Sequence, residues 1–159
     1  MNAEARKLTL RMLSNGVYVM TSCSGDRYGG ATITWVSQAS FRPPFVLAAI
    51  RRDSNVFRCL EESRSAAIHI LGSDQREIAQ RFFKPTTVQS GQMNGEPFRL
   101  SGRSIPILEN APAYVECGVR QIIESEGDHA VVLLEVLEAE CRERVHPLTV
   151  AESPWQYGG

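Results

Sequence analysis

The run Arg51-Arg52-Asp53-Ser54-Asn55 contains residue types suited to binding an anion. It follows an apolar stretch of strand character, and serine is a common cap of a helix N-terminus. The free N–H groups and the positive dipole end of such a helix attract anions, and arginine binds phosphate through two hydrogen bonds. The run therefore predicts a phosphate site for a small ligand. The alternative is that both arginines are solvated and Ser54 is an ordinary helix cap. Residue types alone favour this alternative.

Two further runs carry polar side chains on predicted strands. In residues 31–38 (ATITWVSQ), Thr32 and Thr34 are either solvent-facing strand formers or part of a backbone edge that contacts a flat heterocycle. The run Gly127-Asp128-His129 enters an apolar strand, and a turn is a sufficient reason for its first two residues. His129 is either a structural residue of that turn or a side chain that faces a ligand.

Aromatic residues gather in two more places. In residues 81–84 (RFFK), Phe82 and Phe83 are expected in the core, and Lys84 is either solvated or a second cation beside Arg51. The C-terminal run 155–157 (WQY) places two aromatic rings in a polar segment. Such rings often dock onto the same chain or onto a partner.

Length and charge limit the class of protein. The 159 residues fit a single domain over residues 1–159, and 43% of them are apolar, which argues against disorder. With 17 Lys and Arg against 18 Asp and Glu, the net charge of −1 argues against a polyanion-binding module. No apolar run reaches the roughly 20 residues of a membrane span, and residues 1–13 lack a signal-peptide pattern. We expect a cytoplasmic protein.

The cysteines and histidines are scattered along the chain. Without close ligand pairs they predict neither a disulfide framework nor a zinc site, so the four cysteines are expected to be small buried hydrophobes and no metal is expected. The sequence also has no G-x-G-x-x-G fingerprint, no P-loop and no G-x-S-x-G elbow. Dinucleotide binding of the Rossmann kind and serine-hydrolase chemistry therefore have no support.

Periodicity and turn residues predict the elements that position these runs. Helices are expected at 3–13, 54–62 and 74–83, the last with an Asp74–Glu77 capping box. Strands are expected at 17–22, 31–41, 45–51, 65–71, 113–123, 128–140 and 145–150. Residues 84–112, rich in Gly and Pro, are expected to be a long loop acting as a lid or partner contact. Crossover helices are absent from most connections, which favours an antiparallel barrel with helical decoration.

In order and spacing, these runs resemble the flavin reductase-like family over about residues 7–150. The matching motifs are Gly16-Val17, 31–44 (ATITWVSQASFRPP), 51–54 (RRDS), 74–83 (DQREIAQRFF) and 127–129 (GDH). The resemblance implies a mainly β fold, an antiparallel split β-barrel of Greek-key type with short helices, known as the FMN-binding split barrel. It further implies that two copies form a homodimer sharing each cofactor, with the loop 84–112 and the WQY run as candidates for reaching across.

The resemblance also implies the site residues. The flavin ring and ribityl chain are expected against Ala31, Thr32, Ile33, Thr34 and Trp35, with Ala49, Ile50 and Arg51 beside the ring. The phosphate is expected at Ser54 and Asn55, and a further flavin-contacting turn at Phe82, Phe83 and Lys84. His129 is expected near the nicotinamide as the catalytic and substrate-binding residue, with Tyr157 close to it.

The activity implied is hydride transfer from NADH or NADPH to FMN, with FAD as the alternative flavin. The protein would then supply reduced flavin to a separate monooxygenase or another redox partner. The cofactors carry out this chemistry, so no protein nucleophile or general base is required. The alternative is a flavoredoxin-like electron carrier with tightly bound FMN and little nicotinamide activity. Thr34-Trp35 stands where family members often have Ser-Ser, and Trp35 covering the ring would favour the carrier.

Overall fold

The computed structural model describes residues 1–159 as eleven strands and three short helices. The helices are α1 (Ala3–Arg11), α2 (Asn55–Ser63) and α3 (Arg76–Arg81). The strands are β1 (Tyr18–Ser24), β2 (Arg27–Ile33), β3 (Val36–Phe41), β4 (Pro44–Arg51), β5 (Ser65–Ile70), β6 (Val88–Gln89), β7 (Gln92–Met93), β8 (Glu96–Leu100), β9 (Pro106–Leu108), β10 (Ala113–Ile123) and β11 (His129–Cys141).

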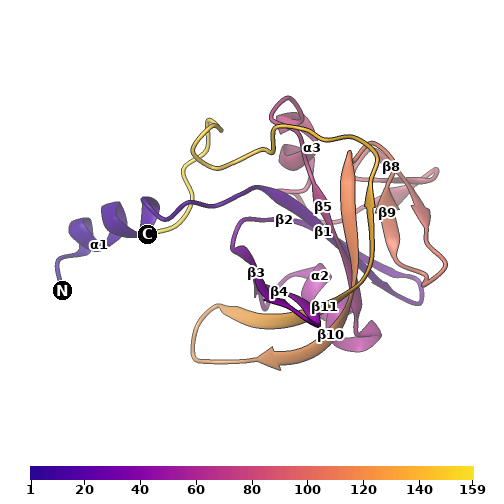
Figure 1. The fold of residues 1–159 in the computed structure, drawn as a ribbon, viewed down its shortest axis with the longest axis horizontal. Helices are drawn as coiled ribbons and strands as arrows, with labels where there is room; N and C mark the ends of the chain where they lie inside the picture. The colour runs from indigo at the N-terminus through magenta and orange to yellow at the C-terminus, as the bar shows by residue number, and fades with distance from the viewer.

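Seven strands form one antiparallel sheet in the order β2-β1-β5-β10-β11-β4-β3. Strands β2 and β3 are its two edges, although only Thr34 and Trp35 separate them in sequence. The sheet must therefore curl until its edges approach each other, as Figure 1 shows. Because the edge strands do not pair with each other, the barrel stays split, which confirms the expected fold class.

The separation of β2 and β3 to opposite edges of the sheet makes the predicted strand at 31–41 wrong. Residues 31–41 are not continuous, because the chain leaves β2 after Ile33 and enters β3 at Val36. At the break, the Ala49 N–H donates to the Trp35 carbonyl (2.9 Å) and the Val36 N–H to the Thr34 carbonyl (3.2 Å). The two residues between the strands thus lie where the barrel edges meet.

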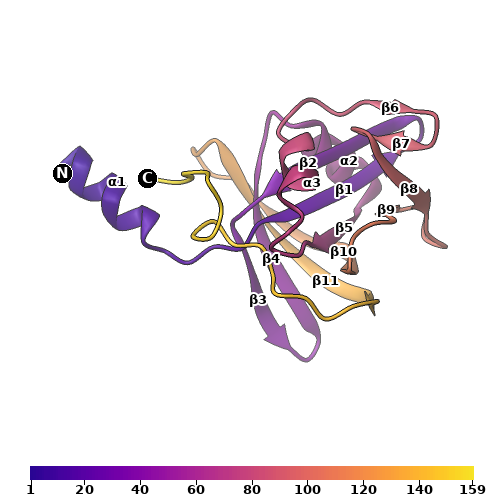
Figure 2. The same cartoon turned by 90° about the horizontal axis from the view of Figure 1, so that it is seen from above.

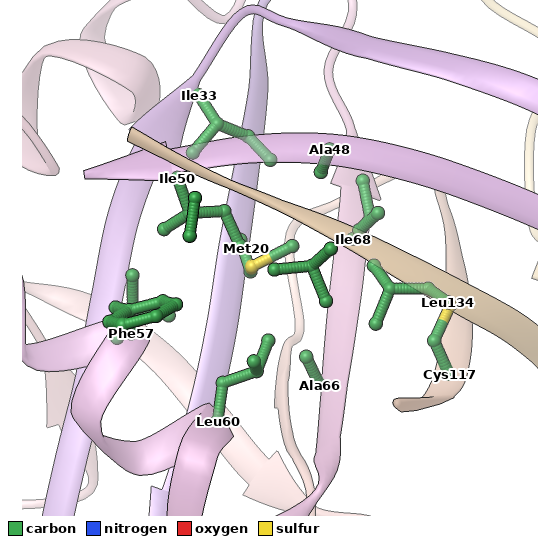
Figure 3. Close-up of a cluster of buried hydrophobic side chains, with 13 residues drawn as sticks. Met20, Ile33, Ala48, Ile50, Phe57, Leu60, Ala66, Ile68, Cys117 and Leu134 are labelled. Atoms are coloured by element: carbon green, nitrogen blue, oxygen red, sulfur yellow. The ribbon is translucent and has the colours of Figure 1, made fainter. Parts of the chain in front are cut away.

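The main core fills the inside of the curled sheet, closed on one side by α2 (Figure 3). Ser54 caps α2 by accepting from the Phe57 N–H (3.2 Å), and Val56, Phe57 and Leu60 are buried against the sheet. Burying one such side chain stabilises a fold by about 2 kcal/mol. A cap and an apolar stripe within nine residues therefore fix the helix start next to the sheet.

Helix α2 crosses β2 very closely at Gly29. A β-carbon at this position would lie 2.6 Å from the backbone nitrogen of Val56, so only glycine fits. The neighbouring Gly30 faces Phe82 and Met93 in the same way, with side chains rather than backbone as the obstacle. The two glycines allow α2 and the segment after α3 to approach both sides of one strand.

The expectation of a long irregular loop at 84–112 is wrong. This segment forms the small sheet β6-β7-β8-β9, packed on the barrel through Met93, Ile107 and Leu108, all of which are buried. The carboxylate of Glu96, only 2% exposed, pairs with Arg81 and accepts from the Asn110 amide (3.1 Å). Strands of two to five residues between turns leave no periodicity to recognise.

His69 ties this small sheet to the barrel. It is fully buried, with Nδ1 3.0 Å from the Val19 carbonyl oxygen and Nε2 accepting from the Leu108 N–H (3.0 Å). The geometry assigns the neutral ring with its proton on Nδ1, donating to that carbonyl. Burial is the main reason that the pKa of His69 is lowered to about 4.

The ends of the chain differ from expectation. Helix α1 projects from the body in both views (Figure 1 and Figure 2), and none of its residues is buried. The expected strand at 145–150 makes only two isolated bridges, Gly16–Thr149 and Gly72–Pro147.

The expected capping box before α3 is also wrong, because the N-cap is Gln75 and makes no side-chain cap bond.

The cysteines follow the prediction only in part. Cys59 and Cys117 are buried, whereas Cys23 is half-buried and Cys141 is exposed, and all four are free thiols. None of the three helices has the length and apolar character needed to cross a membrane.

Candidate functional site

A cavity of about 830 Å³ lies where the barrel edges meet. Its walls come from the β2–β3 connection, the end of β4, the start of α2, the segment after α3, the start of β11 and the C-terminal segment. It is lined by every predicted site residue, namely Ala31, Thr32, Ile33, Thr34, Trp35, Ala49, Ile50, Arg51, Ser54, Asn55, Phe82, Phe83, Lys84, His129 and Tyr157. Their individual roles toward a ligand stay predictions.

The hydroxyl of Thr34 stands out in the cavity wall. Thr34 is 9% exposed, and its Oγ1 is the one buried side-chain polar atom in the chain without a hydrogen-bond partner. A buried hydroxyl without a partner costs about 1–3 kcal/mol. Because Thr34 lines the cavity, its hydroxyl is a candidate hydrogen-bond donor to a polar ligand.

The hydroxyls of two other threonines in the wall form hydrogen bonds within the protein. Thr32 Oγ1 donates to the Ala79 carbonyl (2.6 Å), which fastens β2 to the end of α3. Thr86 Oγ1 accepts from the Gly30 N–H (3.0 Å) and lies 3.2 Å from the Gly30 carbonyl oxygen. Thr32 thus contributes its backbone and methyl group to the cavity, and its hydroxyl has a structural role.

The start of α2 forms a polar end of the cavity. The Ser54 hydroxyl donates to the Arg51 carbonyl (2.7 Å) and accepts from the Phe57 N–H. Ser54 is therefore an N-cap of α2, as the sequence predicted. The first N–H groups of a helix have no intrahelical acceptor, Asn55 at the start of α2 lines the cavity, and Lys84 lies on the same cavity. The free N–H groups, the helix dipole and this cation together suit an anion.

Arg51 is only partly available to such an anion. Its guanidinium donates to both oxygens of Asp53 (3.0 and 2.7 Å) at the exposed rim of the cavity. The hydrogen bond from Arg51 holds the pKa of Asp53 below its usual value. An anion at this end would have to compete with Asp53 for the guanidinium.

Three aromatic rings meet beside Arg51, whose strand partner is His129, and form the aromatic end of the cavity. The ring centre of Trp35 lies 4.7 Å from that of His129 and 5.4 Å from that of Tyr157. His129 Nδ1 is 2.7 Å from Asp128 Oδ1, and this hydrogen bond is the main cause of the lowered pKa of Asp128. Asp128 thus fixes the orientation of the imidazole from outside the cavity.

A second aromatic pair borders the cavity. Phe83 and Trp155 meet edge to face at 4.9 Å, so the WQY run docks onto its own chain. Phe82 is buried as predicted, but Phe83 is 53% exposed, so its placement in the core was wrong. Phe83 lies two residues beyond the end of α3 and packs against Trp155 outside the core.

Some lining residues had no signal in the sequence. Thr86, Pro85 and Ser153 lie in segments without a recognisable motif, and Asp53 entered only as part of the Arg51 run. Gly30 and Val150 also lacked a signal, whereas Val17 lies in the Gly16-Val17 motif and Trp155 and Gln156 lie in the WQY run, although none of the three was predicted as a site residue. Tertiary folding brings positions 30, 85, 86, 150 and 153 to the cavity, so local residue patterns could not identify them.

Comparison with known proteins gives a consistent result. Residues 10–156 match the family described as flavin reductase like domain. The NADH:FMN oxidoreductase of Rhodococcus erythropolis is 32% identical over 127 residues, which cover 80% of this chain and 65% of that protein. Diflavin flavoprotein A 1 of Synechocystis sp. is 30% identical over 125 residues, 78% of this chain but only 22% of that protein.

A solved structure agrees with the same match. The flavin reductase domain protein from Arthrobacter sp. FB24 superposes with a TM-score of 0.78 at 26% identity, covering 89% of this chain and 86% of that one. The fold, including the split sheet that forms the cavity, is thus shared along most of the length of both chains.

Proposed function

Because this chain belongs to the flavin reductase like family, we propose that it transfers hydride from NADH or NADPH to FMN, with FAD as the alternative flavin. The observation that carries the proposal is the unpartnered Thr34 hydroxyl in the cavity wall. It lies in a cavity with an anion-binding helix start and an aromatic cluster on the same walls. The volume of about 830 Å³ lies in the range of small-molecule and cofactor pockets.

The residues present fit a flavin mononucleotide. The free N–H groups at the start of α2 and Lys84 suit its phosphate, and Thr34 suits a hydrogen-bond acceptor on the ring. Trp35, His129 and Tyr157 offer flat faces for stacking. A polar end for phosphate and an aromatic end for rings match the two chemical halves of the cofactor.

Within this proposal, the chain binds and orients its substrates and does no covalent chemistry itself. Bound flavin supplies the redox chemistry by accepting a hydride. Thr34 donates a hydrogen bond into the site, and Arg51 at the cavity rim stabilises negative charge on the reduced cofactor. His129, held by Asp128, contacts the nicotinamide and orients it.

We also propose that the working unit is a homodimer. The outer face of the sheet exposes apolar side chains of three neighbouring strands, Leu47, Ile123, Val131 and Leu137. This face continues into the cavity, since Val131 pairs with Ala49 and His129 with Arg51 in the β4–β11 register. A second copy of the chain on this face would cover it and border both cavities. The four free thiols favour a reducing compartment such as the cytoplasm.

The alternative function is an electron carrier with tightly bound FMN. The contacts of Trp35 with His129 and Tyr157 favour it, because three rings in mutual contact restrict access of a nicotinamide. A carrier would retain FMN through purification and accept electrons from a partner protein. A reductase would turn over NADH or NADPH with added flavin and deliver the reduced flavin to a monooxygenase.

The deciding experiment is an absorption spectrum of the purified protein followed by anaerobic titration with NADH and NADPH. Steady oxidation of either nucleotide with added FMN or FAD supports the reductase. Retained FMN that neither nucleotide bleaches supports the carrier. A protein that takes up no flavin in titration contradicts both functions.

His129→Ala provides the matched test of the nicotinamide end. In a reductase, it should raise the KM for NADH about tenfold, if one contact of about 1.4 kcal/mol is lost, and leave the Kd of FMN unchanged. An equal loss of FMN binding would mean that His129 acts on the fold or on the flavin, and not on the nicotinamide.

A further inference from the structure

The C-terminal segment covers the aromatic end of the cavity with few attachments. Residues 154–159 make no backbone-to-backbone hydrogen bond to any part of the chain. Trp155 rests on Phe83, and Tyr157 rests on Trp35. Both rings line the cavity, so the segment is a cover held mainly by side chains.

Arg11 provides the longest-range polar attachment of this cover. Its Nε donates to the carbonyl oxygen of Gly158 (3.0 Å), and its Nη1 donates to Oε1 of Gln156 (2.8 Å). The two acceptors belong to the residues on either side of Tyr157. One planar guanidinium therefore fixes the chain immediately before and after the ring that contacts Trp35.

A second observation places the segment against the same helix. A β-carbon at Gly159 would lie 2.7 Å from Lys7 Cγ and 2.9 Å from the Lys7 carbonyl oxygen. Figure 1 and Figure 2 both show the end of the chain beside α1, away from the barrel. The chain end thus packs closely along α1 beyond the Arg11 contacts.

Helix α1 has no other visible task in the fold. It buries none of its residues, and its two leucines, Leu8 and Leu10, are exposed. The segment 15–17 that follows it is joined to the body, with the Val17 N–H donating to the Leu148 carbonyl (2.9 Å) and the Val150 N–H to that of Asn15 (2.9 Å). The helix is thus anchored at its C-terminal side, where Arg11 lies.

We propose that Arg11 is a positioning residue that holds Tyr157 against Trp35 and thereby controls how readily the aromatic end of the cavity opens. The hold on the cover is a property of the ligand-free chain. Its effect on ring access rests on the proposed function, because it requires that a flavin or nicotinamide ring enters there. Arg11 itself does not line the cavity and acts on it only through the cover.

The first experiment uses the ligand-free protein and compares Arg11→Ala with Arg6→Ala. Arg6 is an exposed cation on the same helix and its side chain makes no hydrogen bond, so Arg6→Ala controls for charge and helix propensity. Acrylamide quenching of tryptophan fluorescence reports on the cover, because Trp155 belongs to the cover and Trp35, the other tryptophan, lies under Tyr157. Loss of both hydrogen bonds predicts a roughly thirtyfold larger open population, and therefore stronger quenching, in Arg11→Ala only. The midpoint of urea unfolding should not change in either variant.

The second experiment is a double-mutant cycle with Tyr157→Ala, measured as the dissociation rate of FMN and as KM and kcat for NADH. If Arg11 acts through Tyr157, Arg11→Ala and Tyr157→Ala change these values in the same direction, and the double variant equals Tyr157→Ala alone. Arg11→Lys, which keeps the charge but lacks the planar fork, should restore only part of the effect.

The outcomes separate the two proposals. Unchanged quenching in Arg11→Ala overturns the hold, whatever the activity. Stronger quenching with additive effects in the cycle overturns action through Tyr157. Stronger quenching in a protein that binds no flavin leaves the hold intact and contradicts the proposed function instead.

Discussion

Thr34 has opposite effects on the empty and the occupied protein. Its buried hydroxyl has no partner, so it destabilises the empty chain, while a ligand acceptor would turn the same group into a binding contact. We expect Thr34→Val, which is close in shape, to raise the free energy of unfolding without ligand by about 1 kcal/mol. It should weaken FMN binding about tenfold.

Urea unfolding and quenching of FMN fluorescence measure these two effects separately. Thr34→Ser keeps the hydroxyl and is the matched control, so it should retain FMN affinity. A Thr34→Val protein that is less stable without ligand would mean that the hydroxyl has a partner within the chain.

His69 makes a prediction about pH. Its folded pKa of about 4 lies below the reference value of 6.5, so the unfolded chain binds the extra proton first as the pH falls. The stability contributed by the neutral ring is fully present above pH 6.5 and is lost between 6.5 and 4, by about 1.4 kcal/mol for each pH unit.

Carboxylates titrate in the same range, so the measurement is the difference between the wild-type protein and His69→Gln. Urea unfolding at pH 7 and pH 4.5 should show the advantage of the wild-type protein shrinking as the pH falls. A constant difference would contradict a neutral histidine bonded to Val19 and Leu108.

Next to the site, the backbones of α2 and β2 are in close contact at Gly29. In Gly29→Ala the new methyl group meets the backbone of Val56, which cannot move without shifting the helix. We expect a loss of about 2–3 kcal/mol in the free energy of unfolding and weaker FMN binding, because the displaced helix start carries the free N–H groups.

Gly102→Ala is the matched control for this substitution. A β-carbon there meets nothing within 4 Å, so chemical denaturation should show a change of only a few tenths of a kcal/mol. Similar losses in the two variants would mean that the close approach of α2 is not what limits position 29.

The elements also show what local pattern can predict. Strand β10 runs from Ala113 to Ile123, the predicted range, because a long run of strand-forming residues ends in a clear turn. The break at Thr34-Trp35 could not be predicted, since it exists only because distant strands close the barrel. The short strands after Pro85 were missed because pairs of residues carry no period.

The residues of the cavity were easier to predict as a group than as individuals. The motif order that resembles a known family identified the segments around Trp35, Arg51 and His129, and all of them line one cavity. The hydrogen bonds decide which groups are free, and they assign the Thr32 hydroxyl to Ala79 and the Ser54 hydroxyl to the cap. Residue type alone does not distinguish these from Thr34.

At the scale of the whole molecule, the exposed apolar face predicts self-association. We expect sedimentation velocity to give about twice the chain mass of 17.7 kDa at micromolar concentration. Val131→Asp places a charge at the centre of this face and should shift the protein to a monomer. Its side chain points away from the core, so circular dichroism should show the fold unchanged.

Leu100→Asp is the control for this substitution, since Leu100 is also an exposed apolar residue on a strand but belongs to β8. It should remain a dimer. A wild-type protein that sediments as a monomer would contradict the proposed homodimer and leave the cavity to a single chain.

The position of the cavity walls along the sequence has a consequence for synthesis of the protein. The walls draw on residues from Val17 to Tyr157, so the site spans almost the entire polypeptide. Until residues 129–157 have been synthesised, β4 has only β3 as a strand partner, and the cavity lacks the walls from β11 and the C-terminal segment. A nascent polypeptide therefore cannot form the complete site before Tyr157 has left the ribosome, and a ligand that needs all the walls would be taken up after that point.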